Sequence, residues 1–225
     1  MLIGNGILAN EFYDYIKKDE FIIFASGVSN SEVTNIDEFN REKTLLINTI
    51  KESPLKKIVY FSTCSMYDTY FENNDYVMHK LNMENLLIQH SNNYNIFRLP
   101  QVVGKNNKFQ LLGFLFDRIS NGILFNLYDI ERNLIGISDV KIIVDYILCQ
   151  DLFKNKIINI ANPQNIKVID LVKKIEKYLG KKAKYNLIQK EGCFKIDVDM
   201  VSDIYNKKNI FDEKYINKLL EYYEK

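Results

Sequence analysis

The chain has 225 residues, a formal net charge of +1 and a hydrophobic fraction of 47%. This length suits one large domain or two small ones, and the near-zero charge argues against a nucleic-acid partner. The three cysteines, Cys64, Cys149 and Cys193, are far apart, which indicates a reducing compartment and neither a disulfide framework nor a zinc site. Without a signal-peptide pattern or an apolar run of about 18 residues, we expect a cytoplasmic protein outside the membrane.

Strands and helices alternate through the first hundred residues. Apolar runs predict strands at residues 1–3, 20–26, 56–63 and 94–104, and helical periodicity predicts helices at 7–19, 36–53 and 75–91. Asn35 is placed to cap the second helix. This order predicts a Rossmann-like, doubly wound parallel sheet with right-handed crossovers and helices on both faces. Ligands of such sheets bind beyond the carboxyl ends of the strands.

The alternation loosens after Gly104. Helices are expected at residues 109–122, 139–151, 168–180 and 213–225, and strands within 127–138 and at 157–162. We therefore predict a first domain over residues 1–103, with a returning segment near 134–162. A smaller α/β lobe is predicted from residues 104–133 and 163–225.

Residues 4–9 read Gly-Asn-Gly-Ile-Leu-Ala and match the G-x-G-x-x-A pattern between a strand and a helix. In that pattern the first glycine permits a tight turn and the second lets the backbone approach a pyrophosphate. The small third residue lets helix and strand pack closely. An ordinary tight β–α turn is the alternative interpretation.

The stretch Tyr-Val-Met-His-Lys at residues 76–80 places a tyrosine and a lysine one helical turn apart. The spacing alone is weak evidence, because chance predicts about two such pairs in a chain of this composition; Tyr13/Lys17 and Tyr178/Lys182 share it. Context favours Tyr76/Lys80, because Thr63 ends the preceding strand. A lysine there is expected to lower the pKa of the phenol towards neutral, which suits proton transfer with a carbinol oxygen.

Taken in order, these motifs, with "FSTCSMYD", "FRLPQVVG", "RNLIGISDV" and "INIAN", resemble the extended short-chain dehydrogenase/reductases. The likeness is to their nucleotide-sugar epimerase, dehydratase and reductase branch, and it runs over about residues 1 to 175. Only Tyr76/Lys80 falls where this family keeps its catalytic pair.

The resemblance implies a role for each matching residue, with NAD or NADP as cofactor. Thr63, Tyr76 and Lys80 would be catalytic, Tyr76 as the acid–base group and Lys80 also on the nicotinamide ribose. The cofactor would further contact the glycine turn, the ends of two strands and the turn beside the nicotinamide: Gly4, Asn5, Gly6, Ile7, Leu8, Ala25, Ser26, Gly27, Phe61, Ser62, Pro100 and Val102. The substrate would contact Cys64, Ser65, Gln101 and Arg132, the last by its diphosphate; a solvated surface arginine is the alternative.

Two features depart from the family pattern. Between Ala9 and Phe21 there is room for one helix only, where the family inserts two more strands and a helix that carry the adenosine side of its site. No acidic residue follows the strand at 20–26, so the sequence does not distinguish NAD from NADP as the cofactor.

The second departure concerns the residues after Thr63. Cys64 and Ser65 replace the Asp-Glu pair that sugar 4,6-dehydratases place after the catalytic threonine, which argues against a dehydratase. Cys64 is either an acid–base group or a buried thiol.

The remaining expectations concern histidines, assembly and alternatives. His79 is expected on the surface, and His90 near a helix C-terminus. The resemblance implies a homodimer through the helices near 36–53 and 76–91, with a nucleotide sugar as substrate. The leading hypothesis is an enzyme that reduces or epimerises such a sugar. A homologue that binds nucleotide sugars without redox chemistry, or a reductase of small carbonyl compounds, is the alternative.

Overall fold

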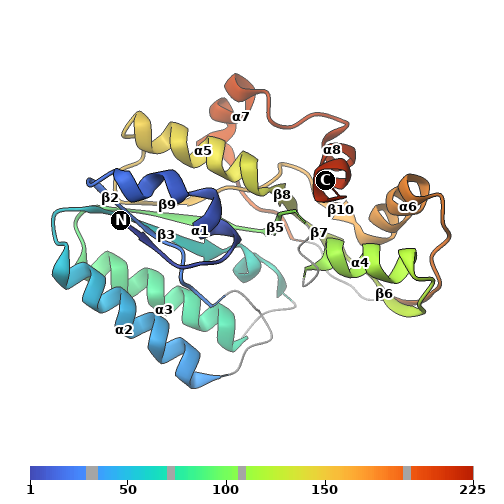
Figure 1. The fold of residues 1–225 in the computed structure, drawn as a ribbon, viewed down its shortest axis with the longest axis horizontal. Helices are drawn as coiled ribbons and strands as arrows, with labels where there is room; N and C mark the ends of the chain where they lie inside the picture. The colour runs from blue at the N-terminus through green and yellow to red at the C-terminus, as the bar shows by residue number, and fades with distance from the viewer. Residues whose placement is uncertain (29–34, 70–73, 106–109, 190–193, 225) are drawn as a thin grey trace. The chain divides into compact units, whose positions relative to one another are not determined.

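The computed structural model describes residues 1–28, 35–69, 74–105, 110–189 and 194–224 (Figure 1). The chain divides into two compact units. The first contains Met1–Leu99 and Val140–Ile160, and the second contains Pro100–Asp139 and Ala161–Lys225. The predicted boundaries, at residue 103 and at a returning segment that starts near residue 134, lie a few residues from these points.

The first unit is built on a five-stranded parallel sheet with the strand order β1-β2-β3-β4-β9. The strands are β1 (Leu2–Ile3), β2 (Phe21–Phe24), β3 (Lys57–Thr63), β4 (Tyr94–Leu99) and β9 (Lys156–Asn159). Its helices are α1 (Ile7–Glu11), the 3₁₀ segments η1 (Tyr13–Lys17) and η2 (Ser65–Tyr67), α2 (Ile36–Glu52), α3 (Asp75–His90) and most of α5 (Ile137–Cys149). These elements confirm the predicted parallel α/β fold.

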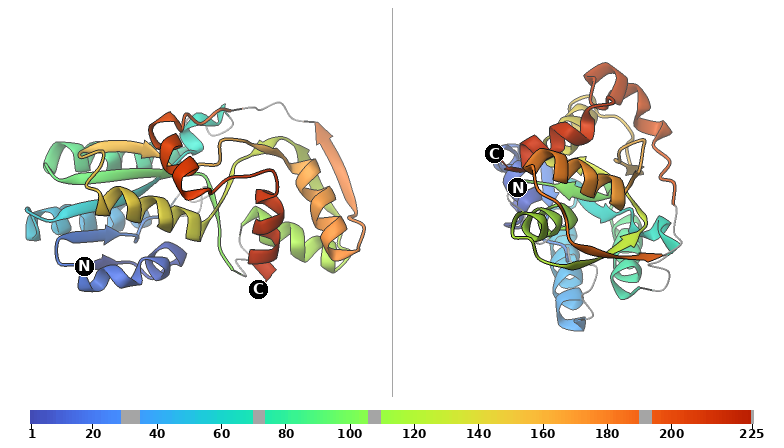
Figure 2. Two further views of the ribbon diagram at one scale, coloured as in Figure 1. Left: turned by 90° about the horizontal axis from the view of Figure 1, so that it is seen from above. Right: turned by 90° about the vertical axis from the view of Figure 1, so that its right-hand side faces the viewer.

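Alternate residues of the strands face opposite layers of helices. Ile58 and Tyr60 of β3 belong to a core cluster that also contains Leu46 of α2 and Met83 and Leu87 of α3. Phe61 faces the other way, and its ring centroid lies 5.3 Å from that of Phe12. Helices α2 and α3 thus cover one face of the sheet, while α1 and α5 cover the other (Figures 1 and 2). Because both faces are buried, all seven residues of β3 are buried.

The crossovers do not all have the predicted right hand. Strands β1, β2 and β3 follow one another in one direction across the sheet. Since α1 and α2 lie on opposite faces (Figure 1), the two crossovers that they form have opposite hands. The expectation of uniformly right-handed crossovers is therefore wrong. The two connections differ in length: the one after β1 holds the five-residue α1 and the five-residue 3₁₀ segment η1, whereas the one after β2 holds the 17-residue α2.

The helix predicted at residues 7–19 is divided in two. Helix α1 ends at Glu11, and η1 begins at Tyr13. Phe12 and Tyr15 are both fully buried, and a 3₁₀ turn places residues three apart on one side. Packing of these two rings, whose centroids are 5.8 Å apart, accounts for the tighter winding.

The second unit contains three small two-stranded sheets. β5 (Gln101–Val103) pairs with β8 (Leu134–Gly136) and β6 (Phe125–Asp129) with β11 (Tyr185–Gln189), both parallel, whereas β7 (Glu131–Arg132) and β10 (Ile166–Lys167) are antiparallel. The helices are α4 (Leu111–Ser120), the start of α5, α6 (Val168–Leu179), the 3₁₀ segment η4 (Asp199–Val201), α7 (Ser202–Lys208) and α8 (Tyr215–Glu224). Helix α6 packs on α4, α8 and β6. β11 and α7 were not predicted.

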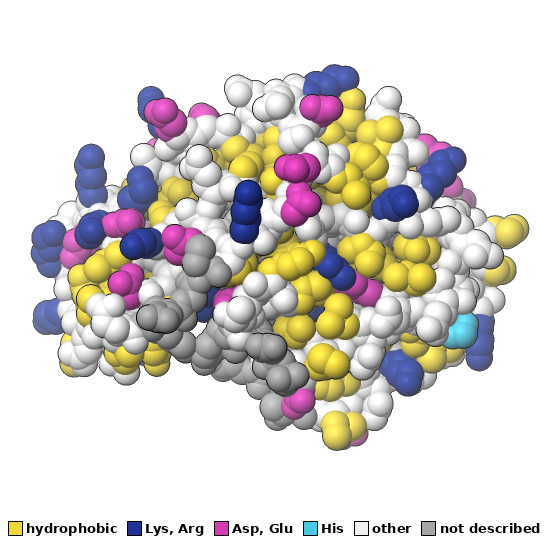
Figure 3. Space-filling view, turned by 180° about the vertical axis from the view of Figure 1, so that it is seen from behind, with side chains coloured by type: hydrophobic (Ala, Val, Ile, Leu, Met, Phe, Trp, Pro, Cys, Tyr) yellow, Lys and Arg dark blue, Asp and Glu magenta, His cyan; other side chains and the backbone are white. Residues whose placement is uncertain are grey.

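Among the described helices, none combines the length and the apolar character needed to cross a membrane. On the face drawn in Figure 3, basic and acidic side chains are interspersed with hydrophobic ones. This mixture agrees with the net charge of +1.

Candidate active site

The parallel sheet brings several predicted site residues to one edge. Gly4 directly follows β1, Ala25 follows β2 and Thr63 ends β3. Parallel strands have their carboxyl ends at the same edge, where ligands of such sheets bind. The candidate site of the first unit is therefore formed by these strand ends and by the first turns of α1 and α3.

The two glycines of the turn after β1 have different surroundings. Gly4 has a φ of +123°, and a Cβ atom there would lie 2.3 Å from the carbonyl oxygen of Ala25, so no other residue fits. A Cβ on Gly6 would meet nothing within 4 Å, so the fold itself does not require glycine at this position. Ala9 is buried, as close packing of α1 requires. Asn5 and Gly6 are exposed, and Ile7 and Leu8 are half-buried. The turn therefore leaves open space beside Gly6, where a pyrophosphate could approach the backbone.

Helix α3 carries Tyr76 into contact with Thr63. Asn74 caps the helix, its side chain accepting hydrogen bonds from the backbone amides of Tyr76 and Val77 at 3.0 and 3.3 Å. Tyr76 is buried, and it forms a hydrogen bond with Thr63. The Thr63 hydroxyl also donates to Ser65 Oγ at 2.9 Å. The sequence-predicted juxtaposition of these two hydroxyls is present.

The expected lowering of the Tyr76 pKa is wrong. Burial raises the pKa of Tyr76 to about 12; the hydrogen bond with Thr63 acts in the opposite direction, and the charge of Glu42 adds to the increase. Lys80 does not counter this effect, because its ammonium is engaged elsewhere. At neutral pH Tyr76 is therefore a phenol, able to give a proton but not to take one.

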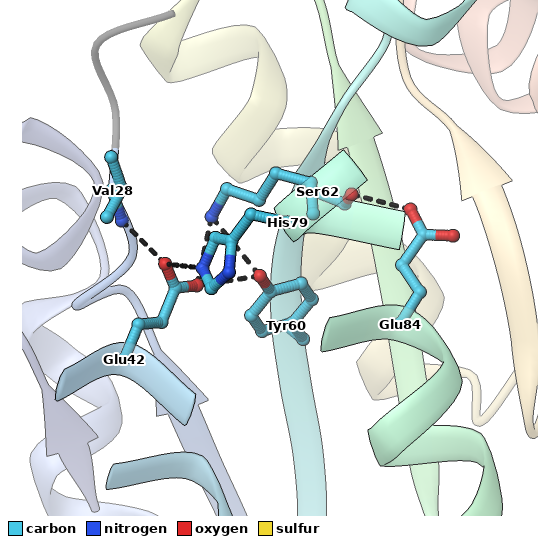
Figure 4. Close-up of polar contacts among 7 residues, drawn as sticks. Val28, Glu42, Tyr60, Ser62, His79 and Glu84 are labelled. Carbon is cyan, nitrogen blue, oxygen red and sulfur yellow. Dashed lines mark hydrogen bonds and ion pairs between the residues drawn. The ribbon is translucent and has the colours of Figure 1, made fainter. Parts of the chain in front are cut away.

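Lys80 is paired with Glu42, a residue of α2 that the sequence analysis did not consider. Lys80 Nζ lies 3.0 Å from Glu42 Oε1 and donates to the Tyr60 hydroxyl at 3.2 Å. Lys80 is 3% exposed and Glu42 is fully buried. The backbone amide of Val28 and the Tyr60 hydroxyl also donate to Glu42, each at 2.7 Å (Figure 4). We call this group, completed by His79, the Glu42 cluster.

His79 is buried and not on the surface, contrary to expectation. Its Nε2 atom lies 2.9 Å from Glu42 Oε2 (Figure 4), and its ring stacks on Phe39 at a centroid distance of 4.4 Å. A carboxylate only accepts hydrogen bonds, so Nε2 carries the proton. His79 follows Tyr76 by three positions and precedes Met83 by four, which places it on the buried side of α3.

The electrostatics of the Glu42 cluster favour the carboxylate. Burial alone would raise the pKa of Glu42, but the ammonium of Lys80 and three hydrogen bonds outweigh it and lower the pKa to about 2. Glu42 is therefore a carboxylate at all physiological pH values. Buried charges of this kind are tolerated when they are paired and hydrogen-bonded.

The turn after β2 lies directly against this ion pair. A Cβ on Gly27 would be 2.4 Å from Lys80 Nζ and 2.9 Å from Glu42 Oε1. Ala25 and Ser26 of the same turn are half-buried. Gly27 therefore has a structural reason to be glycine, beside the cofactor contact that the resemblance implies.

Four other predicted residues lie in β3, in η2 or between the two, and their side chains are buried or half-buried. Phe61 lies among the rings on the α1 face, and Ser62 donates to Glu84 Oε1 at 2.5 Å (Figure 4). Ser65 is half-buried, and its backbone amide donates to Thr63. Cys64 is 1% exposed, and burial raises the pKa of its thiol. This protonated, enclosed thiol matches the structural alternative for Cys64 better than an acid–base role.

The second unit contains the other predicted contacts. Pro100 precedes β5, in which Gln101 and Val102 lie opposite Leu134 and Ile135 of β8. The Gln101 Oε1 atom is buried without a hydrogen-bond partner among the described residues. Arg132 ends β7, and its Nη1 atom donates to the Glu131 carbonyl at 2.9 Å.

The two other Tyr-x-x-x-Lys pairs lack the required setting. Tyr13 and Lys17 lie in the 3₁₀ segment η1, where residues four apart do not share a face. Tyr178 is near the end of α6, which Gly180 terminates before Lys182. Neither pair can present a phenol and an ammonium as successive turns of an α-helix do.

One signal could have identified Glu42 from the sequence. Helix α2 buries Glu42, Leu46, Thr49 and Ile50, so the glutamate occupies the apolar stripe of an amphipathic helix. A charged residue in such a stripe indicates a buried partner. The sequence could not identify that partner, because Lys80 lies 38 positions away.

Comparisons with known proteins support the fold. No protein-family model matches the chain, and no curated protein matches it in sequence. Solved structures do match it. RMD from Pseudomonas aeruginosa, complexed with NADPH, is 13% identical, with a TM-score of 0.69 over 90% of this chain and 80% of that one. The Bordetella bronchiseptica enzyme WbmG, in complex with NAD and UDP, is 12% identical, with a TM-score of 0.71 over 97% and 78%.

A third structure is UDP-N-acetylglucosamine 4-epimerase from Methanobrevibacter ruminantium M1, in complex with UDP-N-acetylmuramic acid. It is 17% identical, with a TM-score of 0.69 over 97% of this chain and 78% of that one. These similarities confirm the Rossmann-like fold. At these identities they concern the fold and not the chemistry.

Proposed function

We propose that the chain is a cytoplasmic NAD(P)-dependent oxidoreductase of the extended short-chain dehydrogenase/reductase family, acting on a nucleotide-linked sugar. Reduction of a keto-sugar or epimerisation of the sugar is the proposed outcome. The observation that carries the proposal is the arrangement of the glycine turn, Thr63 and Tyr76 at the carboxyl edge of one parallel sheet. The ligands of the similar structures, NADPH, NAD with UDP, and a UDP-sugar, support the choice of cofactor and substrate class.

The residues of the turn after β1 fit a dinucleotide. Gly6 has open space where a side chain would stand, which suits close approach of a pyrophosphate to the backbone. Bound there, a nicotinamide dinucleotide supplies a carrier of hydride. Thr63 would hydrogen-bond the reacting oxygen of the sugar, and Tyr76 would move the proton at that oxygen. Arg132 would pair with the diphosphate of the substrate.

Replacement of Tyr76 by phenylalanine tests the catalytic role. Loss of a general acid is expected to reduce turnover of a nucleotide sugar by about 10²- to 10⁴-fold. Tyr13→Phe is the matched control, because Tyr13 belongs to another Tyr-x-x-x-Lys pair and is 67% exposed; its turnover should equal that of the wild type. Full activity of the Tyr76→Phe variant would refute the assignment.

A homologue that binds nucleotide sugars without redox chemistry is the second candidate. Two observations favour it: Glu42 engages the ammonium of Lys80, and the connection between β1 and β2 holds only α1 and η1. Calorimetric titration of NADH and NADPH, with release of any co-purified cofactor by denaturation, separates the two candidates. Micromolar binding supports the enzyme and selects its cofactor, whereas no binding and no retained cofactor support the second candidate. A panel of nucleotide sugars and small ketones tests the substrate class.

We also propose that α2 and α3 form the contact between two copies of the chain. The two helices pack side by side, and Met78 and Ile88 of α3 are 48% and 40% exposed. An Ile88→Lys variant should lower the molar mass measured by light scattering from that of a dimer to that of a monomer. A wild-type protein that is monomeric at high concentration would refute this proposal.

A further inference from the structure

The ammonium of Lys80 donates its hydrogen bonds to groups other than the phenol that it is expected to activate. Two of its three N–H groups are directed at Glu42 and Tyr60, at 3.0 and 3.2 Å. The centroid of the Tyr76 ring lies 6.0 Å from Lys80 Nζ. Glu42 is in turn fixed by hydrogen bonds from α3, β3 and the turn after β2. The ion pair is thus anchored from three elements.

The carboxylate of Glu42 opposes the effect of the Lys80 ammonium on Tyr76. A lone ammonium within about 6 Å would favour the phenolate of Tyr76 by one or more pH units. A carboxylate 3.0 Å from the ammonium cancels much of that effect. The titratable groups that act on Tyr76 are Lys80 of α3, Glu42 of α2, Tyr60 of β3, and Cys64, which directly follows β3; His79 of α3 contacts Glu42.

We propose that Glu42 is a positioning residue that neutralises Lys80, so that Tyr76 gives a proton to a ligand oxygen and does not take one from it. In this step the O–H bond of Tyr76 breaks and an O–H bond forms on the carbonyl oxygen of the ligand, whose carbon would receive the hydride that the NADH or NADPH of the proposed function supplies; the phenolate that remains is reprotonated from solvent. The substrate class that such a site accepts is a carbonyl compound, in the proposed function the keto form of the sugar. The inference rests on the proposed function in treating Tyr76 as the acid–base group and in taking the hydride donor and the keto-sugar from it.

Gly27 supports this assignment independently. The Cα hydrogen of Gly27 faces the ion pair, since a Cβ there would stand 2.4 Å from Lys80 Nζ and 2.9 Å from Glu42 Oε1. The turn after β2 thus closes over the pair and leaves Lys80 little room to turn towards Tyr76. The raised pKa of Tyr76, to which burial contributes most and Glu42 adds, agrees with this arrangement.

The experiment follows the titration of Tyr76 directly. Protein carrying ¹³Cζ-tyrosine is titrated by NMR from pH 7 upwards, and the Tyr76 signal is identified by its loss in Tyr76→Phe. The variants are Glu42→Gln, Lys80→Met and the double variant. We expect Glu42→Gln to lower the midpoint of Tyr76 by about one to two pH units, because it leaves the ammonium uncancelled. The double variant should titrate within about half a unit of the wild type, since it removes both charges.

Glu84→Gln is the matched control. Glu84 of α3 is another buried glutamate, and it forms an ion pair with Arg98 of β4. Its replacement should leave the Tyr76 signal unchanged. An unchanged midpoint in Glu42→Gln, or an equal decrease in Glu42→Gln and the double variant, would overturn the proposal. If Glu42→Gln does not fold, Lys80→Met and the double variant decide: Lys80→Met must titrate above the double variant.

This titration needs neither cofactor nor turnover. Failure of nicotinamide binding in calorimetry would refute the proposed function and leave the titration result standing. Conversely, an active enzyme with an unchanged Tyr76 midpoint in Glu42→Gln would refute only the role of Glu42.

Discussion

Helix α3 contributes to two buried ion pairs one turn apart, Lys80–Glu42 and Glu84–Arg98, and their surroundings differ. Arg98 of β4 contacts Glu84 with two nitrogens, at 2.9 and 2.6 Å, and its third nitrogen donates to the Tyr67 hydroxyl at 2.8 Å. Lys80 meets Glu42 through one atom, beneath the turn at Gly27. The first arrangement is a rigid two-pronged bridge, and the second is a point contact.

This difference separates a structural ion pair from one that can influence chemistry. The Glu84–Arg98 pair joins α3 to β4, and its donors are engaged by residues within the first unit. The Lys80–Glu42 pair lies near Tyr76 and contributes to its pKa. The carboxylate is buried in both pairs, while Arg98 is 15% exposed and Lys80 is 3% exposed. Position relative to the strand ends also separates them, because only the Lys80–Glu42 pair acts on Tyr76.

Breaking the bridge should have the largest effect. Arg98→Met leaves Glu84 buried with Ser62 as its remaining side-chain donor among the described contacts, and we expect a loss of about 3–5 kcal/mol in the free energy of unfolding. Lys80→Met should cost less, because Val28, Tyr60 and His79 still donate to Glu42. Urea unfolding measures both values, and an equal or larger loss in Lys80→Met would contradict the comparison.

The pH dependence of stability should identify the contribution of Glu42. Its pKa falls from 4.5 to about 2 on folding, so the unfolded chain binds the proton more readily. The stabilisation is present above about pH 4.5 and is lost as the pH falls towards 2, and it amounts to about 3 kcal/mol. We expect the difference in unfolding free energy between wild type and Glu42→Gln to shrink over this range. A difference that stays constant from pH 6 to pH 2.5 would exclude this mechanism.

Glycine substitutions should separate the fold from the ligand site. Gly27→Ala forces its Cβ against Lys80 and Glu42, and we expect a cost of about 1–3 kcal/mol in unfolding free energy. Gly6→Ala is the control, because nothing lies within 4 Å of its Cβ. That variant should keep its stability and lose affinity for NADH or NADPH in calorimetry. A stable Gly27→Ala variant would show that the ion pair can move.

The smallest effect on stability is expected at the N-cap of α3, the helix that carries one member of each ion pair. Asn74 accepts hydrogen bonds from the first amides of α3, and Asn74→Ala should cost about 1 kcal/mol. Asn35→Ala, at the cap of α2, is the matched variant. Thermal unfolding should show similar decreases for the two. A much larger decrease for Asn74→Ala would mean that the cap holds Tyr76 and the ion pairs in place beyond its role in the helix.

The sequence alone predicted most of the elements of the first unit. The strand at 56–63 and the helix at 75–91 were identified because apolar periodicity reports burial on a sheet or a helix face. Asn35 was correctly expected to cap α2, since its side chain accepts a hydrogen bond from the amide of Asp37 at 2.9 Å. These features depend on neighbours in the chain, and local pattern therefore suffices to predict them.

Tertiary structure decided the charges of the candidate site. His79 was misplaced because a single helix pattern does not show that α2 packs beside α3 and supplies Glu42 as a partner. The pKa of Tyr76 was expected to fall, but it rises, because burial and a carboxylate from another helix outweigh the spacing of Tyr76 and Lys80. The sequence thus determined which hydroxyl and which ammonium lie on successive turns. Only the packing of α2, α3 and β3 decided that the ammonium pairs with Glu42, because interactions between charges depend on distance in space and on burial.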